Sequence, residues 1–493
     1  MLRFPGYLNT LIDNFMNPFP FSSGSSSSGR RAFIKNSALL AAASSGLPLV
    51  RGAEGQASKA AAKAADDNYV RPVPSTNLRV ACIGVGGKGR SDVMDLANYA
   101  HIVAFADVDF TPGSRAAQTL KHFPEVSRFT DFRVMFEKMG REFDAVTIST
   151  PDHSHFPAAM LAMAHGKHVF VQKPMANTIW ECRQMLLAAR KSKVVTQMGI
   201  QGHTFEGQRL LKEWLEVGAI GEVESVRYWT NRPIWPQKAK LEWAPSDRPA
   251  DINWDVWQGT VATDRPFSRD LHPFKWRAAW DYGCGALGDI GCHLFDAAFW
   301  ALDLDAPASV EPLAATAFDE SSAPAQSMLK YRFTSAKGRT LARPVDFVWS
   351  DGGLLPPRPA ALDANRVLDP LFGQLIHGTN GQIYSPGGYC ETLRLIPESS
   401  MQAFAANRPA KKYPRVSDGP IKEWIDAIQQ GTQPGANFEY ASKLTEIVLL
   451  GNLAIRLGRT IEWDPVALKA KGLPEADALI KREYRKGWEF SVT

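Results

Sequence analysis

Short apolar runs alternate with amphipathic segments between residues 78 and 200. The apolar runs cover 78–84, 101–106, 143–149 and 166–171, and the helical patterns cover 91–100 and 156–165. Strands that alternate with helices predict an α/β domain built on a parallel, doubly wound sheet. The carboxyl ends of such strands share one edge, where these sheets bind ligands. We therefore expect a ligand site where these apolar runs end.

The hydrophobic period changes near residue 201. Residues 221–229 alternate between apolar and polar, which predicts a strand with one solvated face. Residues 317–415 are typical of strands joined by long loops, and helical patterns follow at 421–430 and 440–458. We assign residues 77–200 to the first domain and 201–465 to the second, with 466–493 as a carboxyl-terminal tail.

The first 76 residues have a different character. Arg30 and Arg31 are followed by Phe33, Lys35 and a weakly apolar Ala/Ser-rich run. Residues 1–52 therefore resemble a twin-arginine export signal, with an amphipathic or disordered tail as the alternative. Residues 53–76 are typical of a flexible linker. The resemblance implies an exported protein, periplasmic or extracellular.

Composition narrows the class of protein. The chain of 493 residues is 45% hydrophobic and 22% charged, as expected for a globular protein of two domains. Most of its net charge of +5 lies in residues 1–52, so no nucleic-acid partner is expected. No apolar run after residue 50 is long enough to span a bilayer. The five scattered cysteines favour free thiols, with a Cys284–Cys292 bridge left open.

A glycine-rich turn follows the first apolar run. It contains Gly84, Gly86, Gly87 and Gly89, between a predicted strand and a predicted helix. Such glycines permit a tight turn, let the backbone approach a pyrophosphate and let the helix pack on the strand. Asp107 ends the next strand at the distance expected for an acid that binds the adenosine ribose. We predict NAD as cofactor, with NADP disfavoured by that carboxylate, and Asp109 as second choice for the ribose.

Two further motifs carry a resemblance to a known family. The first is Thr150-Pro151-Asp152-His153-Ser154-His155 with Gln172-Lys173-Pro174, and the second is the glycine-rich run 283–291 with Asp289 and His293. Both resemble the Gfo/Idh/MocA oxidoreductases, whose usual Glu-Lys-Pro has Gln172 in its first place here. The resemblance covers about residues 78–465.

The resemblance implies several further features. The second domain would be an α/β unit built on a large, open, mostly antiparallel sheet. The protein would be a dimer or tetramer. Thr150, Pro151, His155 and Lys173 would bind the cofactor, with His155 in the nicotinamide pocket. Lys173, Asp289 and His293 would be the catalytic residues.

The chemistry of those three residues fits oxidation of an alcohol. Hydride transfer from a carbinol requires a base for the hydroxyl proton and a group that stabilises the developing alkoxide. Asp289 and His293 are four residues apart, so on a helix they share a face. We assign His293 as acid/base, Asp289 as substrate binder and Lys173 as electrostatic partner, and the roles of Lys173 and His293 could be exchanged.

Weaker substrate candidates follow. They are Gln201 and His203, with Gln197, after the strand near 194–196, and Trp276 and Arg277 in a tryptophan-rich stretch. Indole rings suit the apolar faces of sugars, although core packing explains most of these tryptophans better. A metal site at Asp152, His153 and His155 is disfavoured because all three lie on one turn without a fourth ligand, so we expect none.

Three functions remain open. The first is an NAD(P)-dependent oxidoreductase that acts on a CH–OH group of a sugar or cyclitol. The second is a glycoside-cleaving enzyme that uses tightly bound NAD in an oxidation, elimination and reduction cycle, which suits a compartment without free nicotinamide. The third, a non-catalytic sugar-binding protein, is disfavoured by the presence of Lys173, Asp289 and His293.

Overall fold

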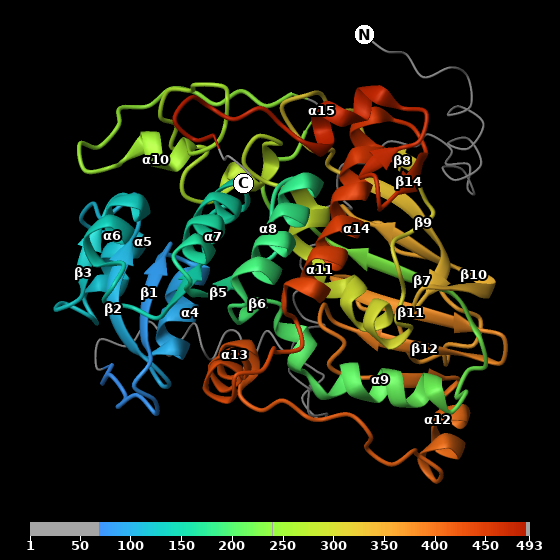
Figure 1. Cartoon of the computed structure of the whole chain (residues 1–493). Coiled ribbons are helices and arrows are strands. Elements are labelled where there is room, and N and C mark those ends of the chain that lie inside the picture. Colours follow the sequence, from blue (N-terminus) through green and yellow to red (C-terminus); the bar gives the residue numbers. More distant parts are fainter. Residues whose placement is uncertain (1–68, 239, 490–493) are drawn as a thin grey trace, which may run out of the picture. The chain divides into compact units, whose positions relative to one another are not determined.

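A computed structural model describes residues 69–238 and 240–489 (Figure 1). The predicted twin-arginine segment and residues 53–68 of the predicted linker lie outside the described residues. The first domain contains a six-stranded sheet in the order β3-β2-β1-β4-β5-β6, and every neighbouring pair is parallel. Its strands are β1 (Arg79–Ile83), β2 (His101–Ala106), β3 (Ser127–Phe129), β4 (Ala145–Ile148), β5 (His168–Val171) and β6 (Thr196–Met198).

Apolar strands form the centre of this sheet. The central strands β1 and β4 are apolar almost throughout, and helices cover both faces of a sheet of this kind. The helices are α4 (Lys88–Leu96), α5 (Arg115–Leu120), α6 (Phe132–Met139), α7 (His155–Ala164) and α8 (Ile179–Ser192). Helix α8 begins with a capping box between Thr178 and Glu181, which satisfies two free backbone N–H groups.

The second domain is built on a nine-stranded sheet in the order β13-β12-β11-β7-β10-β9-β8-β14-β15. Its strands are β7 (Val223–Thr230), β8 (Ser309–Ala315), β9 (Ser327–Ala336), β10 (Arg339–Ser350), β11 (Phe372–Gly378), β12 (Gly381–Pro386), β13 (Arg394–Ile396), β14 (Ile461–Asp464) and β15 (Lys469–Ala470). Only β7 and β10 pair in parallel among its named strand pairs. The predicted α/β fold, with a parallel sheet followed by a mostly antiparallel one, is confirmed.

Two long helices connect the domains. The remaining helices are α9 (Glu206–Glu216), α10 (Trp254–Gln258), α11 (Gly285–Ala301), α12 (Glu398–Ala405), α13 (Gly419–Gln430), α14 (Phe438–Leu457) and α15 (Asp477–Ile480). Helix α11 packs against α14, which also contacts α8 of the first domain and β8 of the second (Figure 1). The approach is close: a Cβ added at Gly451 would lie 2.5 Å from Leu287 Cδ2. This pair of helices forms a core shared by both sheets.

The chain crosses back to the first domain twice after residue 400. Helix α13, which the sequence analysis placed in the second domain, contacts α4, β5 and β6, and its Trp424 ring lies 5.7 Å from that of Phe170. The predicted tail also returns. Arg482 donates to Asn177 and pairs with Glu181 of α8, at 2.9 and 3.3 Å. The boundary at 465 therefore marks no structural division.

Other expectations concern the surface and the thiols. Within residues 69–238 and 240–489, no helix combines the length and apolar character that crossing a membrane requires. All five cysteines are buried and unpaired, so the Cys284–Cys292 bridge that was left open is not formed. Most tryptophans of the stretch 235–280 are buried, in agreement with core packing.

Candidate active site

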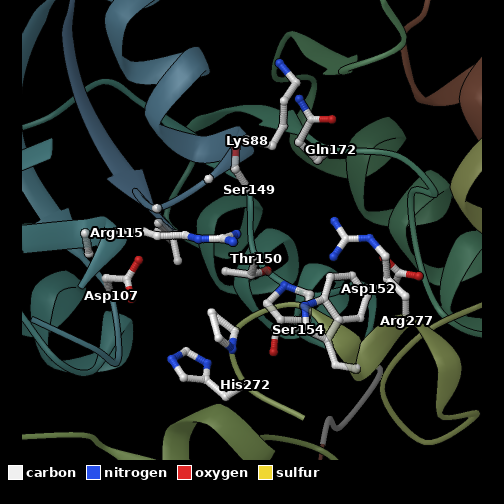
Figure 2. A pocket seen from close by; sticks show the side chains of 18 of the residues that line it. Lys88, Asp107, Arg115, Ser149, Thr150, Asp152, Ser154, Gln172, His272 and Arg277 are labelled. Atoms are coloured by element: carbon white, nitrogen blue, oxygen red, sulfur yellow. The ribbon is translucent and has the colours of Figure 1, made fainter. Parts of the chain in front are cut away.

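One cavity of about 700 Å³ lies at the carboxyl edge of the parallel sheet (Figure 2). Its walls come from the ends of β1, β2, β4 and β5, from the start of α11, and from the long segment between β7 and α11. The predicted site residues that line it are Gly84, Gly86, Gly87, Asp107, Thr150, Pro151, Lys173, Gln201, Trp276, Arg277, Asp289 and His293. Residues that lie far apart in the sequence, such as Gly84 and His293, therefore meet in one cavity.

The glycine turn forms one end of this cavity. Gly84 has a φ of +76°, and a Cβ there would lie 2.7 Å from the carbonyl oxygen of Ser149. A Cβ on Gly89 would lie 1.9 Å from the carbonyl oxygen of Gly84, so Gly89 lets α4 begin directly against β1. Helix α4 begins at Lys88. This cradle fits the pyrophosphate of a dinucleotide, because a side chain would fill the space and a helix N-terminus faces it.

Asp107 connects the glycine turn to the end of β2. Its carboxylate accepts hydrogen bonds from the backbone N–H groups of Val85 and Asp109, at 2.8 and 3.1 Å. Burial raises its pKa, and these hydrogen bonds oppose the rise. The alternative ribose ligand, Asp109, is already bound by His272, whose Nε2 lies 2.9 Å from its carboxylate. Asp107 is the carboxylate with acceptor capacity left toward the cavity.

Arg115 is a cavity residue that the sequence analysis missed. It lies at the first position of α5, and its guanidinium group extends across the cavity near Asp107 (Figure 2). Within the described residues it makes no ion pair, and its only aromatic neighbour is Phe274, at 6.0 Å. This end of the cavity therefore contains a cation as well as the predicted carboxylate.

The unusual Gln172 has a physical explanation. Its Nε2 donates to Asp92 Oδ2 at 2.9 Å, and the same oxygen accepts the Ser149 hydroxyl at 2.8 Å. Asp92 also pairs with Lys88, whose Nζ lies 2.5 Å from Oδ1. A glutamate at position 172 would place a second carboxylate beside buried Asp92, and like charges at that distance repel. Gln172 thus contacts Asp92, whereas the carboxylate beside Lys173 is Asp289.

Lys173, Asp289 and His293 lie at the other end of the cavity. Lys173 Nζ donates to the backbone oxygen of Asp289 and lies 3.3 Å from its Oδ1. Helix α11 places His293 one turn after Asp289, as predicted. Burial would raise the pKa of Asp289, but the cations of Lys173, Arg277 and Arg232 hold it below its ordinary value. Asp289 is therefore a carboxylate at neutral pH.

His293 is buried and uncharged in the folded protein. Its side chain is 3% exposed, and its ring lies edge-on to Tyr389 with the centroids 4.7 Å apart. Burial, together with the positive charge of Lys173, holds its pKa well below the ordinary value. The ring is therefore neutral at pH 7. Its Nδ1 is buried and has no hydrogen-bond partner in the described part of the chain.

Several predicted residues do not line the cavity. His155 is buried, with its ring nitrogens 2.8 Å from the Pro174 carbonyl oxygen and 2.9 Å from that of Thr150. The sequence predicts His155 in the nicotinamide pocket, but these contacts keep its ring out of the cavity lining. His203 pairs with buried Asp296 at 2.9 Å, because its turn faces α11. Gln197 donates to Glu423 of α13 at 2.9 Å.

The residues considered for a metal site have separate partners. His153 is fully buried between the carbonyl oxygens of Trp257 and Tyr282, whereas Asp152 faces the cavity and accepts the N–H of Cys284 at 3.1 Å. Within residues 69–238 and 240–489, no three His, Cys, Asp or Glu side chains gather as metal ligands would.

Asp152 gives the site a group that titrates near neutrality. Burial raises its pKa to about 7, against the opposing charges of Arg277 and Lys173. The folded protein thus binds this proton more tightly than the unfolded chain does. The resulting stabilisation is complete below pH 4 and is lost as the pH rises through 7.

We therefore expect Asp152→Asn to stabilise the protein above pH 7. The melting temperature of the variant minus that of the wild type should rise by about 2 °C or more between pH 5 and pH 8, the shift that about 1 kcal/mol produces in a large domain. Thermal denaturation followed by circular dichroism at both pH values measures it. A difference that does not change with pH would contradict the buried, titrating carboxyl.

The fold and the cradle together define a two-domain protein with an NAD-binding Rossmann domain. Residues 78–200 match the family model described as "Oxidoreductase family, NAD-binding Rossmann fold", and residues 217–339 match "Oxidoreductase family, C-terminal alpha/beta domain". The chain belongs to the Gfo/Idh/MocA oxidoreductase family.

Three relatives illustrate the range of proteins that this chain resembles. Levoglucosan dehydrogenase of Pseudarthrobacter phenanthrenivorans is 27% identical, over 45% of this chain and 50% of its own. A glycosyl hydrolase family 109 protein of Shewanella pealeana is 30% identical, over 39% and 44%. Inositol 2-dehydrogenase of Pseudomonas fluorescens is 30% identical, over 35% and 51%. The chain spans about half the length of these curated relatives.

Solved structures share the fold over a larger part of this chain than the curated relatives cover. The WlbA dehydrogenase of Bordetella pertussis, solved with NADH and UDP-GlcNAcA, has a TM-score of 0.55 at 17% identity, over 79% of this chain and 99% of its own. Levoglucosan dehydrogenase with NADH and L-sorbose has a TM-score of 0.54 at 19% identity, over 78% and 99%. At this identity the likeness establishes the arrangement of the two domains.

Proposed function

We propose that the protein oxidises a secondary hydroxyl of a sugar or cyclitol with NAD. The observation that carries the proposal is one cavity with a dinucleotide cradle at one end and Lys173, Asp289 and His293 at the other. NAD, when bound, supplies the hydride acceptor. The relatives named as levoglucosan and inositol dehydrogenases support the substrate class.

The protein's own residues then handle the proton and the charge. Neutral His293 accepts the hydroxyl proton, and the Lys173 ammonium stabilises the alkoxide as its charge develops. Asp289 holds Lys173 in place and can accept a hydrogen bond from a neighbouring hydroxyl. The opposite assignment, with Lys173 as the proton acceptor, uses the same contacts.

Product analysis tests the proposal. Purified protein is incubated with free sugars, cyclitols and aryl glycosides, while NADH is followed at 340 nm and the products by mass spectrometry. We expect a product two mass units lighter than its substrate and one NADH for each product. If no member of the panel is oxidised in the presence of NAD, the proposal fails.

Glycoside cleavage is the second candidate, favoured by the relative named as a family 109 glycosyl hydrolase. In that reaction the substrate is oxidised, loses its aglycone by elimination, takes up water and is reduced again. Release of an aryl group without net NADH would identify it in the same incubation.

The cofactor preference can be measured separately. The carboxylate of Asp107 accepts ribose hydroxyls and repels a 2′-phosphate, although Arg115 adds a cation nearby. We expect Asp107→Ala to weaken NAD about 10–100-fold, the usual effect of losing a hydrogen bond to a charged group. Calorimetry with NAD and NADP on nucleotide-free protein measures it. Tighter NADP binding by the wild type would contradict the assignment of Asp107.

Export through the twin-arginine route remains a proposal that rests on Arg30 and Arg31. The double variant R30K/R31K should leave precursor in the cytoplasm, as fractionation of expressing cells would show. Unchanged export of this variant would exclude that route. Assembly as a dimer or tetramer is likewise proposed, and light scattering measures it.

A further inference from the structure

The substrate end of the cavity contains more positive than negative charge. Arg232 Nε lies 3.6 Å from Asp289 Oδ2, and Arg277 Nε lies 3.6 Å from Oδ1. Lys173 Nζ lies 3.3 Å from the same Oδ1. Three cations therefore surround one carboxylate, and all four side chains line the cavity.

Neighbouring groups leave this excess uncompensated. Asp152 is the other carboxyl at this end of the cavity, and burial raises its pKa to about 7, which reduces its negative charge at neutral pH relative to an ordinary carboxylate. His293 contributes no charge, because burial holds its pKa well below neutrality. The side chains of Arg232 and Arg277 are 21% and 24% exposed, so their charges are only partly solvated. Such a site attracts an anion.

The two arginines also keep donors available. At 3.6 Å, neither Nε makes a hydrogen bond to Asp289. Arg232 donates through Nη1 to the side-chain oxygen of Asn231 at 2.9 Å, and Arg277 donates through Nη1 to the carbonyl of Phe274 at 3.1 Å. Within the described residues, the Nη2 group of each makes no hydrogen bond. These N–H groups are therefore available to a ligand.

Aromatic rings fix the orientation of both guanidinium groups. The Arg277 Cζ lies 4.3 Å from the centroid of the Trp276 ring and 4.7 Å from that of Phe274. The Arg232 Cζ lies 5.0 Å from the centroid of the Phe372 ring. These rings lie close to each guanidinium group, and a guanidinium group with free N–H donors can bind a carboxylate through two parallel bonds.

We propose that Arg232 and Arg277 bind a carboxylate of the substrate, so that the substrate is a sugar acid, such as a uronate or its glycoside. The inference rests on the proposed function and narrows its substrate class. Asp289 contacts Lys173 and both arginines. One small substrate can therefore place its reacting hydroxyl at Lys173 and its own carboxylate at the arginines. A neutral sugar would leave the excess positive charge around Asp289 uncompensated.

Binding to the NADH-loaded protein tests the proposal without turnover. The probes are D-glucuronate and D-galacturonate, each with its uncharged amide, together with D-glucose and D-glucose 6-phosphate. We expect each acid to bind at least about tenfold more tightly than its amide, since a hydrogen bond to a charged group contributes about 1.5–3 kcal/mol. Isothermal titration calorimetry gives the dissociation constants.

Variants test whether Arg232 causes the preference for the acid over the amide. Arg232→Gln should reduce the preference for the acid over the amide about tenfold, and Arg232→Lys should retain part of it. Arg265→Gln is the matched control, because Arg265 pairs with Asp281 at 2.8 Å and does not line the cavity. It should bind the acid as the wild type does. Melting temperatures verify that all variants are folded.

Three results would overturn the inference: amides that bind as tightly as the acids, no binding of either acid, or an Arg232→Gln variant that weakens acid and amide equally. Tighter binding of D-glucose 6-phosphate than of the acids would indicate that the arginines bind a phosphate, and it would overturn the inference as well. Failure of the proposed function is distinguishable, since the acids would then bind with the expected preference and yet not be oxidised.

Discussion

Replacing His293 by alanine should lower turnover about 10²–10⁴-fold, the range usual for loss of a general base. The ring is neutral and buried, and in the proposed mechanism it accepts the hydroxyl proton. NAD should still bind, because the glycine cradle lies at the other end. The measurement is the turnover number with any substrate found by product analysis, together with bound nucleotide and melting temperature.

A matched variant supports the interpretation. His101→Ala changes an exposed histidine at the start of β2, away from the cavity, and should leave turnover unchanged. If His293→Ala is folded, retains NAD and turns over at the wild-type rate, His293 is not the acid/base. If it loses NAD as well, the ring supports the shape of the whole cavity.

Lys173→Ala should reduce turnover about 10²–10³-fold, because it removes a preorganised cation from the developing alkoxide. Arg232 and Arg277 remain beside Asp289, so this carboxylate keeps positive neighbours and the fold should survive. Steady-state kinetics should show the loss mainly in kcat, since the interaction strengthens as charge develops.

Lys330→Ala is the control for this variant. Lys330 pairs with Glu311 at 2.8 Å on the second sheet and does not line the cavity. Its replacement should change neither kcat nor KM. A Lys173→Ala enzyme with normal kcat and a raised KM would show that Lys173 only binds the substrate.

Local pattern predicted the first domain well. The apolar runs at 78–84 and 101–106 became β1 and β2, because runs of that length beside turn residues favour buried strands. The helix after the glycine turn began three residues earlier than the pattern suggested, at Lys88. Gly89 permits this early start, since its lack of a side chain lets the first turn lie against Gly84.

The site was only partly predictable. Asp289 and His293 were predicted mainly from the family resemblance of their glycine-rich motif, and their four-residue spacing on a helix added support. Arg232 was missed because its role depends on the meeting of β7 and α11, which local spacing does not encode. Asp92 follows the glycine turn within ten residues, and Arg115 follows Asp107 within ten residues. Both were missed nevertheless, because local spacing does not encode which groups they meet.

His203 shows the opposite error. Its place after a strand end suggested a ligand contact, but its ring turned inward to Asp296. A polar residue in such a turn can satisfy a buried partner as readily as a ligand, and sequence alone does not distinguish the two outcomes.

The returning carboxyl-terminal segment has a consequence for dissecting the protein. Glu181 of α8 is fully buried, and its partners include Arg482 and Tyr484, about three hundred residues further on. A fragment that ended at residue 200 would leave this carboxylate without either of them, in an apolar setting, and would expose Phe170 where Trp424 now packs. We therefore expect the dinucleotide-binding half alone, although continuous in sequence, to be less stable than the same residues are in the whole chain.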